Sequence, residues 1–172
     1  MDNAIHIVLP ETADRPGTRL LHTEQWVPAP PEVVFPFFSD PRNLETLTPP
    51  WLGFSVEDVP EGPMGEGVSI GYRLHLHGVP LRWRSRIIDW REGKSFSDVQ
   101  ERGPYALWHH THRFIPSDGG TLLVDEVRFR LRGGALAMAL LGPWVTRDLR
   151  RIFAYRHATI HELFSVPMKQ NG

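Results

Sequence analysis

The chain has 172 residues, of which 41% are hydrophobic and 23% are charged, and its formal net charge is −1. This composition is typical of a globular domain with a core of its own and argues against intrinsic disorder. The near-neutral charge gives no electrostatic case for nucleic-acid binding, and the absence of cysteine excludes disulfides, thiolate nucleophiles and cysteine-ligated metals.

The N-terminus lacks the basic start and long apolar run of a signal peptide. We expect an N-terminal arm over residues 1–17, one domain over 18–166 and a C-terminal tail over 167–172. The longest apolar run, residues 133–145, is shorter than the roughly 18 residues needed to span a bilayer. The sequence therefore predicts a cytoplasmic protein that does not span a membrane, either a monomer or a homodimer.

The N-terminal third of the domain begins with a strand and continues with helices. Residues 18–27 are rich in β-branched and aromatic side chains, which favours a strand. Pro30 and Pro31 suit the opening of a helix, which Pro36 should kink or shorten. A second short helix over 41–47 should end before the next prolines. The apolar side of the first helix is predicted to be Val33, Val34, Phe37 and Phe38.

The next eighty residues have the pattern of antiparallel strands with one dry and one wet face. Apolar and polar residues alternate with a period of two, and Gly/Pro or Ser-Asp-Gly-Gly turns separate the segments. The expected strands are 53–59, 68–78, 79–90, 94–103, 105–116 and 121–131.

The C-terminal part is helical in pattern. Residues 143–164 carry apolar side chains at helical spacing, and at ~1.5 Å per residue such a helix would extend ~33 Å, long enough to cross the sheet. The apolar segment 133–144 before it is expected to be a short buried helix. The alternatives are a flap over the pocket mouth or a contact with a membrane or partner when ligand is exchanged. Together these elements predict an α+β architecture.

Side-chain parity predicts which groups face the space between the sheet and the last helix. Asp125 falls among the apolar residues of its strand, so its carboxylate must be paired, hydrated or protonated. Arg156 falls on the apolar face of the helix, where Asp98, Asp125 or a ligand anion could be its partner. The predicted pocket residues are Trp83, Phe96, Asp98, Gln100, Trp108, His110, His112, Phe114, Asp125 and Arg156.

The segment ALWHHTHRF, residues 106–114, raises the question of a metal site. His110 and His112 lie two apart on one strand face, so they could share a metal, and Asp125 would complete a two-histidine-one-carboxylate set. The alternatives are a pair of polar groups lining a pocket or a purely structural pair. The pocket-lining interpretation is favoured, and we expect no metal and no cofactor.

Several stretches together resemble the START-like helix-grip superfamily, also called the polyketide cyclase/dehydrase and lipid transport (SRPBCC) clan. They are PAPPEVVFPFFSDPRNLETLTPPWLGF, GVPLRWRSRIIDW, GPYALWHHTHRF, GGTLLVDEVRFRL and RRIFAYRHATI, and the resemblance covers about residues 18–165. Within this superfamily, the sequence is similar to the branch of small bacterial ligand-binding proteins. The resemblance implies a curved seven-stranded antiparallel sheet around the C-terminal helix, with two short helices after the first strand and a hydrophobic pocket.

Two functions follow as expectations. The first is binding of a hydrophobic small molecule of lipid, polyketide or aromatic type between the sheet and the C-terminal helix. The alternative is a polyketide cyclase/aromatase or dehydratase in which His110, His112 and Asp125 act as acid–base groups. A structural or partner-binding domain is a third class, and it predicts an exposed apolar patch in place of a ligand.

Overall fold

The structure, a computed structural model, describes residues 6–8, 15–59 and 61–165. One antiparallel sheet has the strand order β1-β2-β8-β7-β6-β5-β4-β3. The strands are β1 (His6–Val8), β2 (Arg19–Val27), β3 (Ser55–Asp58), β4 (Ser69–Leu76), β5 (Val79–Arg91), β6 (Ser95–Arg102), β7 (Tyr105–Ser117) and β8 (Gly120–Leu131). The helices are α1 (Pro31–Ser39), α2 (Leu44–Leu47) and α3 (Gly134–Ser165), with 3-10 turns at Pro41–Asn43 and Pro50–Leu52.

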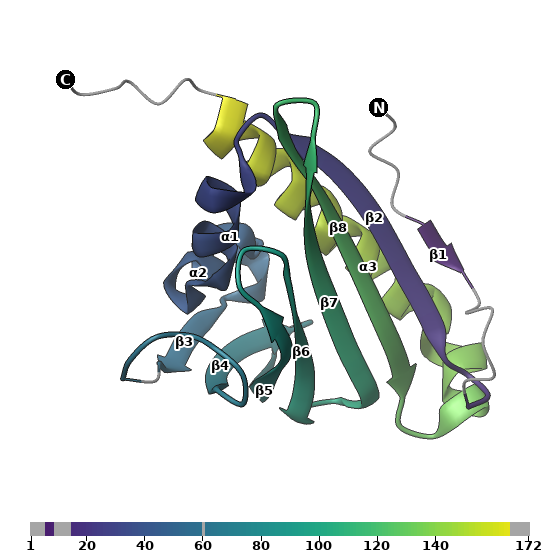
Figure 1. Cartoon of the computed structure of the whole chain (residues 1–172). Coiled ribbons are helices and arrows are strands. Elements are labelled where there is room, and N and C mark those ends of the chain that lie inside the picture. The colour runs from purple at the N-terminus through teal and green to yellow at the C-terminus, as the bar shows by residue number, and fades with distance from the viewer. Residues whose placement is uncertain (1–5, 9–14, 60, 166–172) are drawn as a thin grey trace.

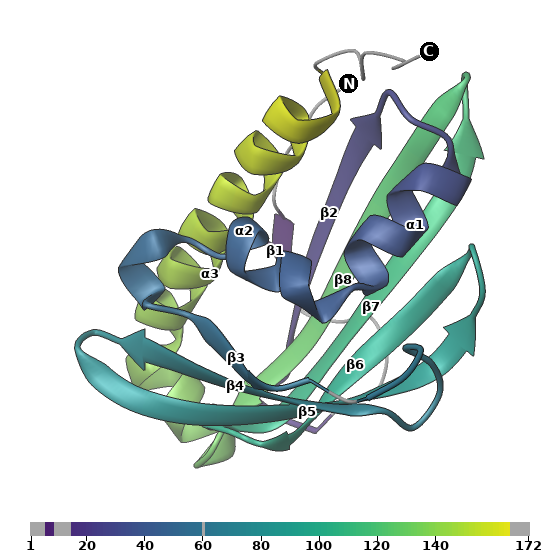
Figure 2. The same cartoon turned by 90° about the vertical axis from the view of Figure 1, so that its left-hand side faces the viewer.

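The sheet is strongly curved, and the helices lie on its concave side. Figure 1 shows the long strands β2, β8 and β7 side by side with α3 running behind them. Figure 2 shows that β3, β4 and β5 turn across the base of the molecule, while α1 and α2 fill the space between α3 and the sheet. This arrangement leaves an interior bounded by the sheet and α3.

Tight turns fix the register of the two hairpins that matter for this interior. His77 and Gly78 join β4 to β5 with positive φ angles of 52° and 80°. Asp118 and Gly119 join β7 to β8 with φ angles of 47° and 77°. Turns with both central residues left-handed match the twist of the flanking strands, so each hairpin is held in one register.

Helix α1 begins at one proline and contains another, and its apolar side is buried. Pro31 stands at the first helical position, where a missing N–H costs nothing, and the helix continues through Pro36 to its end at Ser39. Its buried side chains include Val34, Phe35 and Phe38. The four predicted residues of the apolar side, Val33, Val34, Phe37 and Phe38, are buried or pack against the core, but the prediction missed Phe35, which is also buried.

Helix α3 begins earlier than the sequence indicated. Residues 134–142 belong to the same helix as residues 143–165, and Pro143 lies inside it. The prediction that the apolar segment 133–144 is a short buried helix was wrong, since Leu140 is 72% and Trp144 69% exposed. The first turns of α3 extend the helix with most of their large apolar side chains in solvent, whereas Met138 is buried.

The core consists of two apolar clusters with polar residues between them. One cluster gathers around Phe35, Phe38 and Phe114, and the other around Leu149 and Phe153 of α3. Along the inward face of β7, Trp108 packs with the second cluster and Phe114 belongs to the first. The side chains between them on that face are His110 and His112, both buried.

The predicted α+β helix-grip architecture is confirmed. Strands β2 to β8 are the seven expected strands, with the two short helices following the first of them. The short strand β1, within the segment predicted as an arm, pairs antiparallel with β2. The predicted tail, residues 167–172, lies outside the described residues. Within the described part of the chain, no helix combines the length and hydropathy that crossing a membrane requires.

Candidate functional site

A cavity of about 200 Å³, the main cavity, lies between the sheet and α3. Its walls are mostly apolar and come from the second 3-10 turn, β4, β5, β7 and α3. One end is polar, where Asp98, His110, His112 and Arg156 reach its surface. The remaining lining residues are Leu44, Thr48, Leu52, Phe54, Tyr72, Leu74, Leu76, Leu81, Trp83, Ser85, Pro104, Tyr105, Trp108, Leu149 and Ile152.

The polar end is built by the register of three neighbouring strands. Asp98 of β6 stands opposite His110 of β7, and His112 of β7 stands opposite Asp125 of β8. His110 hydrogen-bonds through Nε2 to Asp125 Oδ1 at 3.0 Å. His112 Nδ1 is 2.6 Å from the same oxygen. Both imidazoles therefore present one nitrogen to Asp125 and the other toward Asp98.

Asp98 is held from the opposite side by β5. Ser85 Oγ donates a hydrogen bond to Asp98 Oδ1 at 3.2 Å, and Trp83 Nε1 donates to Ser85 Oγ at 3.0 Å. The other carboxylate oxygen, Oδ2, lies 3.4 Å from His110 Nδ1 and 3.5 Å from His112 Nε2. One oxygen of Asp98 is thus anchored and the other faces the two imidazoles.

Arg156 brings the charge of α3 into this cluster. Its Nε lies 3.6 Å from Asp125 Oδ2, and its guanidinium stands over the ring of Phe38 at 5.1 Å. Of the partners that the sequence left open, Asp125 is the one within ion-pair distance. The pair joins α3 to β8 and places a buried cation beside a buried carboxylate, which is the arrangement that burial of either charge requires.

The charges of the cluster compensate one another. Burial opposes ionisation of Asp125, but Arg156 and His112 hold its pKa well below the usual value. Burial also opposes ionisation of Asp98, but His112 and His110 lower its pKa. Burial lowers the pKa of His110, whereas for His112 the effect of burial is outweighed by Asp125, which raises the pKa. The charges of the two carboxylates and Arg156 sum to −1, and a proton on His112 brings the sum to zero.

A third histidine lies behind the cluster on α3. His157 is buried and hydrogen-bonds through Nε2 to Thr23 Oγ1 of β2. Gln25 Nε2 donates to the backbone carbonyl oxygen of His157 at 2.9 Å. Burial lowers the pKa of His157, so its neutral form is the stable one in the folded protein. His157 is not among the residues that line the main cavity.

The structure places the sequence-predicted pocket residues in four groups. Those that line the main cavity are Trp83, Asp98, Trp108, His110, His112 and Arg156. Phe96 lines a smaller cavity of about 40 Å³ beside it. Asp125 is 1% exposed and lies behind the imidazoles, away from the cavity surface. Phe114 packs in the core, and Gln100 bonds the backbone of Tyr105, so neither lines the main cavity.

Sequence reasoning missed several of the residues that line the main cavity, among them Ser85, Tyr105 and Leu52. Ser85 has the correct parity on β5, between Trp83 and Ile87, and this pattern was the signal that could have identified it. Tyr105 stands at the first position of β7, where alternation had too little chain to indicate a face. Leu52 belongs to a 3-10 turn, which has no such periodicity.

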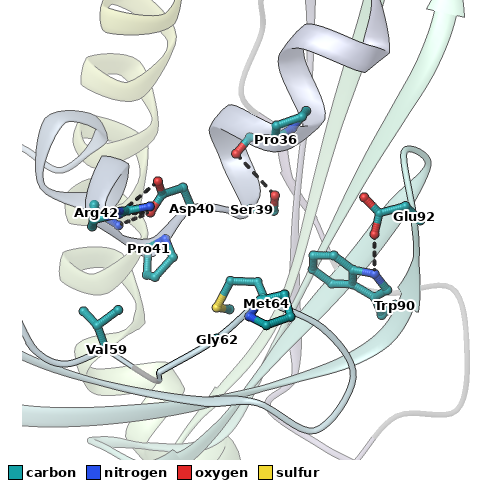
Figure 3. Close-up of a pocket in the computed structure, with 11 residues that line it drawn as sticks. Pro36, Ser39, Asp40, Pro41, Arg42, Val59, Gly62, Met64, Trp90 and Glu92 are labelled. Carbon is teal, nitrogen blue, oxygen red and sulfur yellow. Dashed lines mark hydrogen bonds and ion pairs between the residues drawn. The ribbon is translucent and has the colours of Figure 1, made fainter.

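A separate surface groove lies near α1. It measures about 520 Å³ and is lined by Pro36, Asp40, Arg42, Met64 and Trp90 among others (Figure 3). Its charged pair, Arg42 with Asp40, is solvent-exposed at the guanidinium. The described residues that line the groove offer an ordinary surface ion pair and prolines, and they form no cluster of buried titratable groups comparable with that of the main cavity.

The groove nevertheless adjoins the interior. The 40 Å³ cavity shares Met64 and Trp90 with the groove, and Asp98, His112 and Arg156 with the main cavity. The three hollows therefore succeed one another from the surface beside α1 to the polar end of the main cavity. On the other side, a hollow of about 280 Å³ near the β4–β5 turn shares lining residues with the apolar end: Leu52, Leu76 and Ile152.

Comparison with known proteins identifies both a sequence family and structural relatives. The family model described as polyketide cyclase / dehydrase and lipid transport matches residues 20–158. A search of curated proteins gives no significant match.

Three solved structures illustrate the shared fold. The Zhui aromatase/cyclase from Streptomyces sp. R1128 is 17% identical, with 90% of this chain and 98% of that chain covered and a TM-score of 0.67. The protein TTHA0849 from Thermus thermophilus is 21% identical, with 83% and 94% covered and a TM-score of 0.62. A START superfamily protein from Mycobacterium smegmatis is 13% identical, with 84% and 98% covered and a TM-score of 0.59. At these identities the likeness shows the fold alone.

Proposed function

Because the chain belongs to the polyketide cyclase/dehydrase and lipid transport family, we propose that it binds a hydrophobic small molecule in the main cavity. The observation that carries the proposal is the cavity itself, which has apolar walls and one polar end formed by Asp98, His110, His112 and Arg156. Ligand sites commonly combine predominantly apolar walls with a few polar groups that fix orientation.

The size and lining of the cavity define the class of ligand. An apolar protein cavity of ~150 Å³ holds a molecule of about the size of benzene. At about 200 Å³ the main cavity suits a compact ring system or a short acyl chain. Trp83 and Trp108 supply aromatic surface, and the imidazoles can exchange hydrogen bonds with a carbonyl or hydroxyl oxygen. A planar molecule with one oxygen at its end matches both the aromatic walls and the polar end of the cavity.

A direct test is a titration of the protein with 2-naphthol in which binding is measured by isothermal titration calorimetry. Leu74 lines the cavity and is half-buried, so Leu74→Trp fills part of the space. Leu140→Trp makes the same change on the exposed start of α3 and serves as the matched control. We expect one molecule of 2-naphthol per chain for the unmodified protein and for the control, and at least tenfold weaker binding, ~1.4 kcal/mol, for Leu74→Trp.

The opposite results would overturn the proposal. They are absence of 2-naphthol binding to the unmodified protein, or equal affinity of the Leu74→Trp and Leu140→Trp variants. Native mass spectrometry of the protein purified without denaturation gives an independent measurement. A mass excess that disappears in the Leu74→Trp variant, and persists in the control, supports an occupant of the cavity.

A second candidate function is acid–base catalysis on the bound molecule. The observation that favours it is that both imidazoles of the polar end line the cavity, within reach of a bound carbonyl compound. This candidate predicts that the protein accelerates exchange of the α-hydrogens of 2-tetralone in D2O, measured by NMR. His110→Gln and His112→Gln should abolish the acceleration while the circular dichroism spectrum is unchanged. An exchange rate equal to that of buffer would dismiss it.

A further inference from the structure

The polar end of the main cavity brings together three side chains of the kind that bind metal ions. Ligand atoms of Asp98, His110 and His112 all lie within 4.8 Å of one another. Asp98 Oδ2 is 3.4 Å from His110 Nδ1 and 3.5 Å from His112 Nε2. Metal–ligand bonds of roughly 2.0–2.2 Å place neighbouring ligand atoms of a tetrahedral site about 3.3–3.6 Å apart. We propose that these three side chains bind one divalent transition-metal ion.

Hydrogen bonding alone leaves this cluster incompletely satisfied. Nitrogen-to-oxygen distances of 3.4 and 3.5 Å exceed the roughly 2.7–3.2 Å of ordinary hydrogen bonds. The imidazole nitrogens that face Asp98 are therefore held to it by long contacts only, and a metal ion bound between them would give each of the three ligand atoms a close partner.

The residues behind the three ligands are those that a metal site needs. Metal-binding imidazoles usually give their second nitrogen to a carboxylate, which orients the ring. Asp125 Oδ1 takes this place for both His110 and His112. Ser85 holds the other oxygen of Asp98, which directs Oδ2 toward the imidazoles. Asp98 Oδ2, His110 Nδ1 and His112 Nε2 point toward one another, because the other polar atom of each side chain is held by Ser85 or Asp125.

The site would have open coordination positions toward the cavity. Asp98, His110 and His112 line the main cavity, whereas Asp125 does not. Two histidines and one carboxylate with free positions suit Zn²⁺ or Fe²⁺. With neutral imidazoles, the charges of Asp98, Asp125 and Arg156 sum to −1. A divalent ion therefore brings the net charge of the cluster to +1. An anionic oxygen donor on the cavity side then restores neutrality, which adds carboxylates and enolates to the ligand class.

This inference replaces the sequence-based expectation of no metal, and it is independent of the proposed ligand binding. Parity identified His110, His112 and Asp125 as the possible set, but it could not show that Asp125 lies behind the imidazoles. The register of β6 against β7 supplies Asp98 as the third ligand in its place.

The test is titration of the full-length protein, prepared without a histidine tag and freed of metal by EDTA and dialysis. Co²⁺ is followed by its visible absorption bands and Zn²⁺ by calorimetry. The matched control is His77→Gln, which removes the imidazole of an exposed His77–Asp148 pair. We expect one equivalent of bound metal, at least 100-fold weaker binding for Asp98→Asn, and unchanged binding for His77→Gln.

Two further variants keep the proposal testable if Asp98→Asn fails to fold. Ser85→Ala removes only the hydroxyl that orients Asp98 and should weaken Zn²⁺ binding severalfold. Asp125→Asn should weaken it about 10–100-fold, as for other residues behind metal ligands. The proposal is overturned if no stoichiometric metal binds, or if His77→Gln removes the binding. Binding of 2-naphthol to metal-free protein is measured separately, so its failure and that of the metal site are distinguishable.

Discussion

Asp125 lies against both imidazoles of the polar end and against the Arg156 guanidinium. At the scale of single residues it therefore links the charges of β7 with those of α3. Removing one partner of a buried ion pair leaves the other charge uncompensated. We expect Asp125→Asn, which preserves shape, to lower the free energy of unfolding by about 3–5 kcal/mol, measured by urea denaturation.

Glu126→Gln provides the matched control for this prediction. Glu126 is the next residue along β8, and its side chain is partly exposed, beside Arg113 and His22. The same acid-to-amide change there should cost at most about 1 kcal/mol. The double variant Asp125→Asn/Arg156→Met should lose less stability than the sum of the two single variants, because no unpaired charge is left. Strict additivity would show that the two side chains do not interact.

His157 gives a prediction about pH. Burial lowers its pKa in the folded protein, while Asp125 raises it and Arg156 lowers it to smaller extents. The unfolded chain therefore takes up a proton at His157 first, from about pH 6.5 downward. The contribution of His157 to stability is constant above that pH and is lost as the pH falls toward the folded-state pKa.

The measurement is the free energy of unfolding at pH 7.5 and pH 5.5 for the unmodified protein and for His157→Gln. We expect the unmodified protein to lose more stability between these two pH values than the variant does. The reason is that residue 157 carries a titrating imidazole in the unmodified protein and an amide in the variant. Thr23 hydrogen-bonds the ring and carries no charge, so it adds no titration of its own. Equal losses in the two proteins would contradict the assignment of His157 as a buried neutral group.

Parity explains how much of the site was predictable at the residue scale. Alternation along β7 correctly places Trp108, His110 and His112 at the main cavity, since the strand is regular there. The same argument fails for Gln100, which lies near the end of β6, where its side chain turns to bond the backbone of Tyr105. Phe114 is inward as expected, but α1 covers it with Phe35 and Phe38.

At the scale of elements, the two halves of α3 differ in burial. Ile160 is buried against the core cluster of α1, whereas Leu140 is 72% exposed on the first turns. We expect Ile160→Ala to lower the free energy of unfolding by about 2–5 kcal/mol, and Leu140→Ala to change it by less than about 0.5 kcal/mol. Similar losses in urea denaturation would show that the start of α3 is packed in solution.

The early start of α3 also shows why the sequence misplaced this element. Pro143 is a usual helix-opening residue, so the pattern indicated a helix from that position. The preceding residues, Ala135 to Leu141, have high helix propensity and continue the helix upstream of the proline. An apolar composition predicted burial, but no other element of the described chain covers most of these side chains. Composition alone contains no information about that coverage.

At the scale of the whole molecule, the fold was predictable and the interior was not. Turn residues and alternation fix seven strands in one antiparallel order, and the last apolar helix must cover the concave face. Whether the enclosed space is filled or hollow depends on the packing of side chains from distant segments, such as Leu52 and Ile152. The position of the 40 Å³ cavity between the groove and the main cavity depends on such contacts as well.

Ligand binding in the space between the sheet and α3 is what the proposed function requires of this molecule. A crystal structure of the protein grown with 6-bromo-2-naphthol tests it most directly, through the anomalous signal of bromine. We predict one bromine peak inside the main cavity, near Trp83 and Trp108, with the hydroxyl toward His110 and His112. A peak only in the surface groove beside α1, or a main cavity filled by collapsed side chains, would contradict the account.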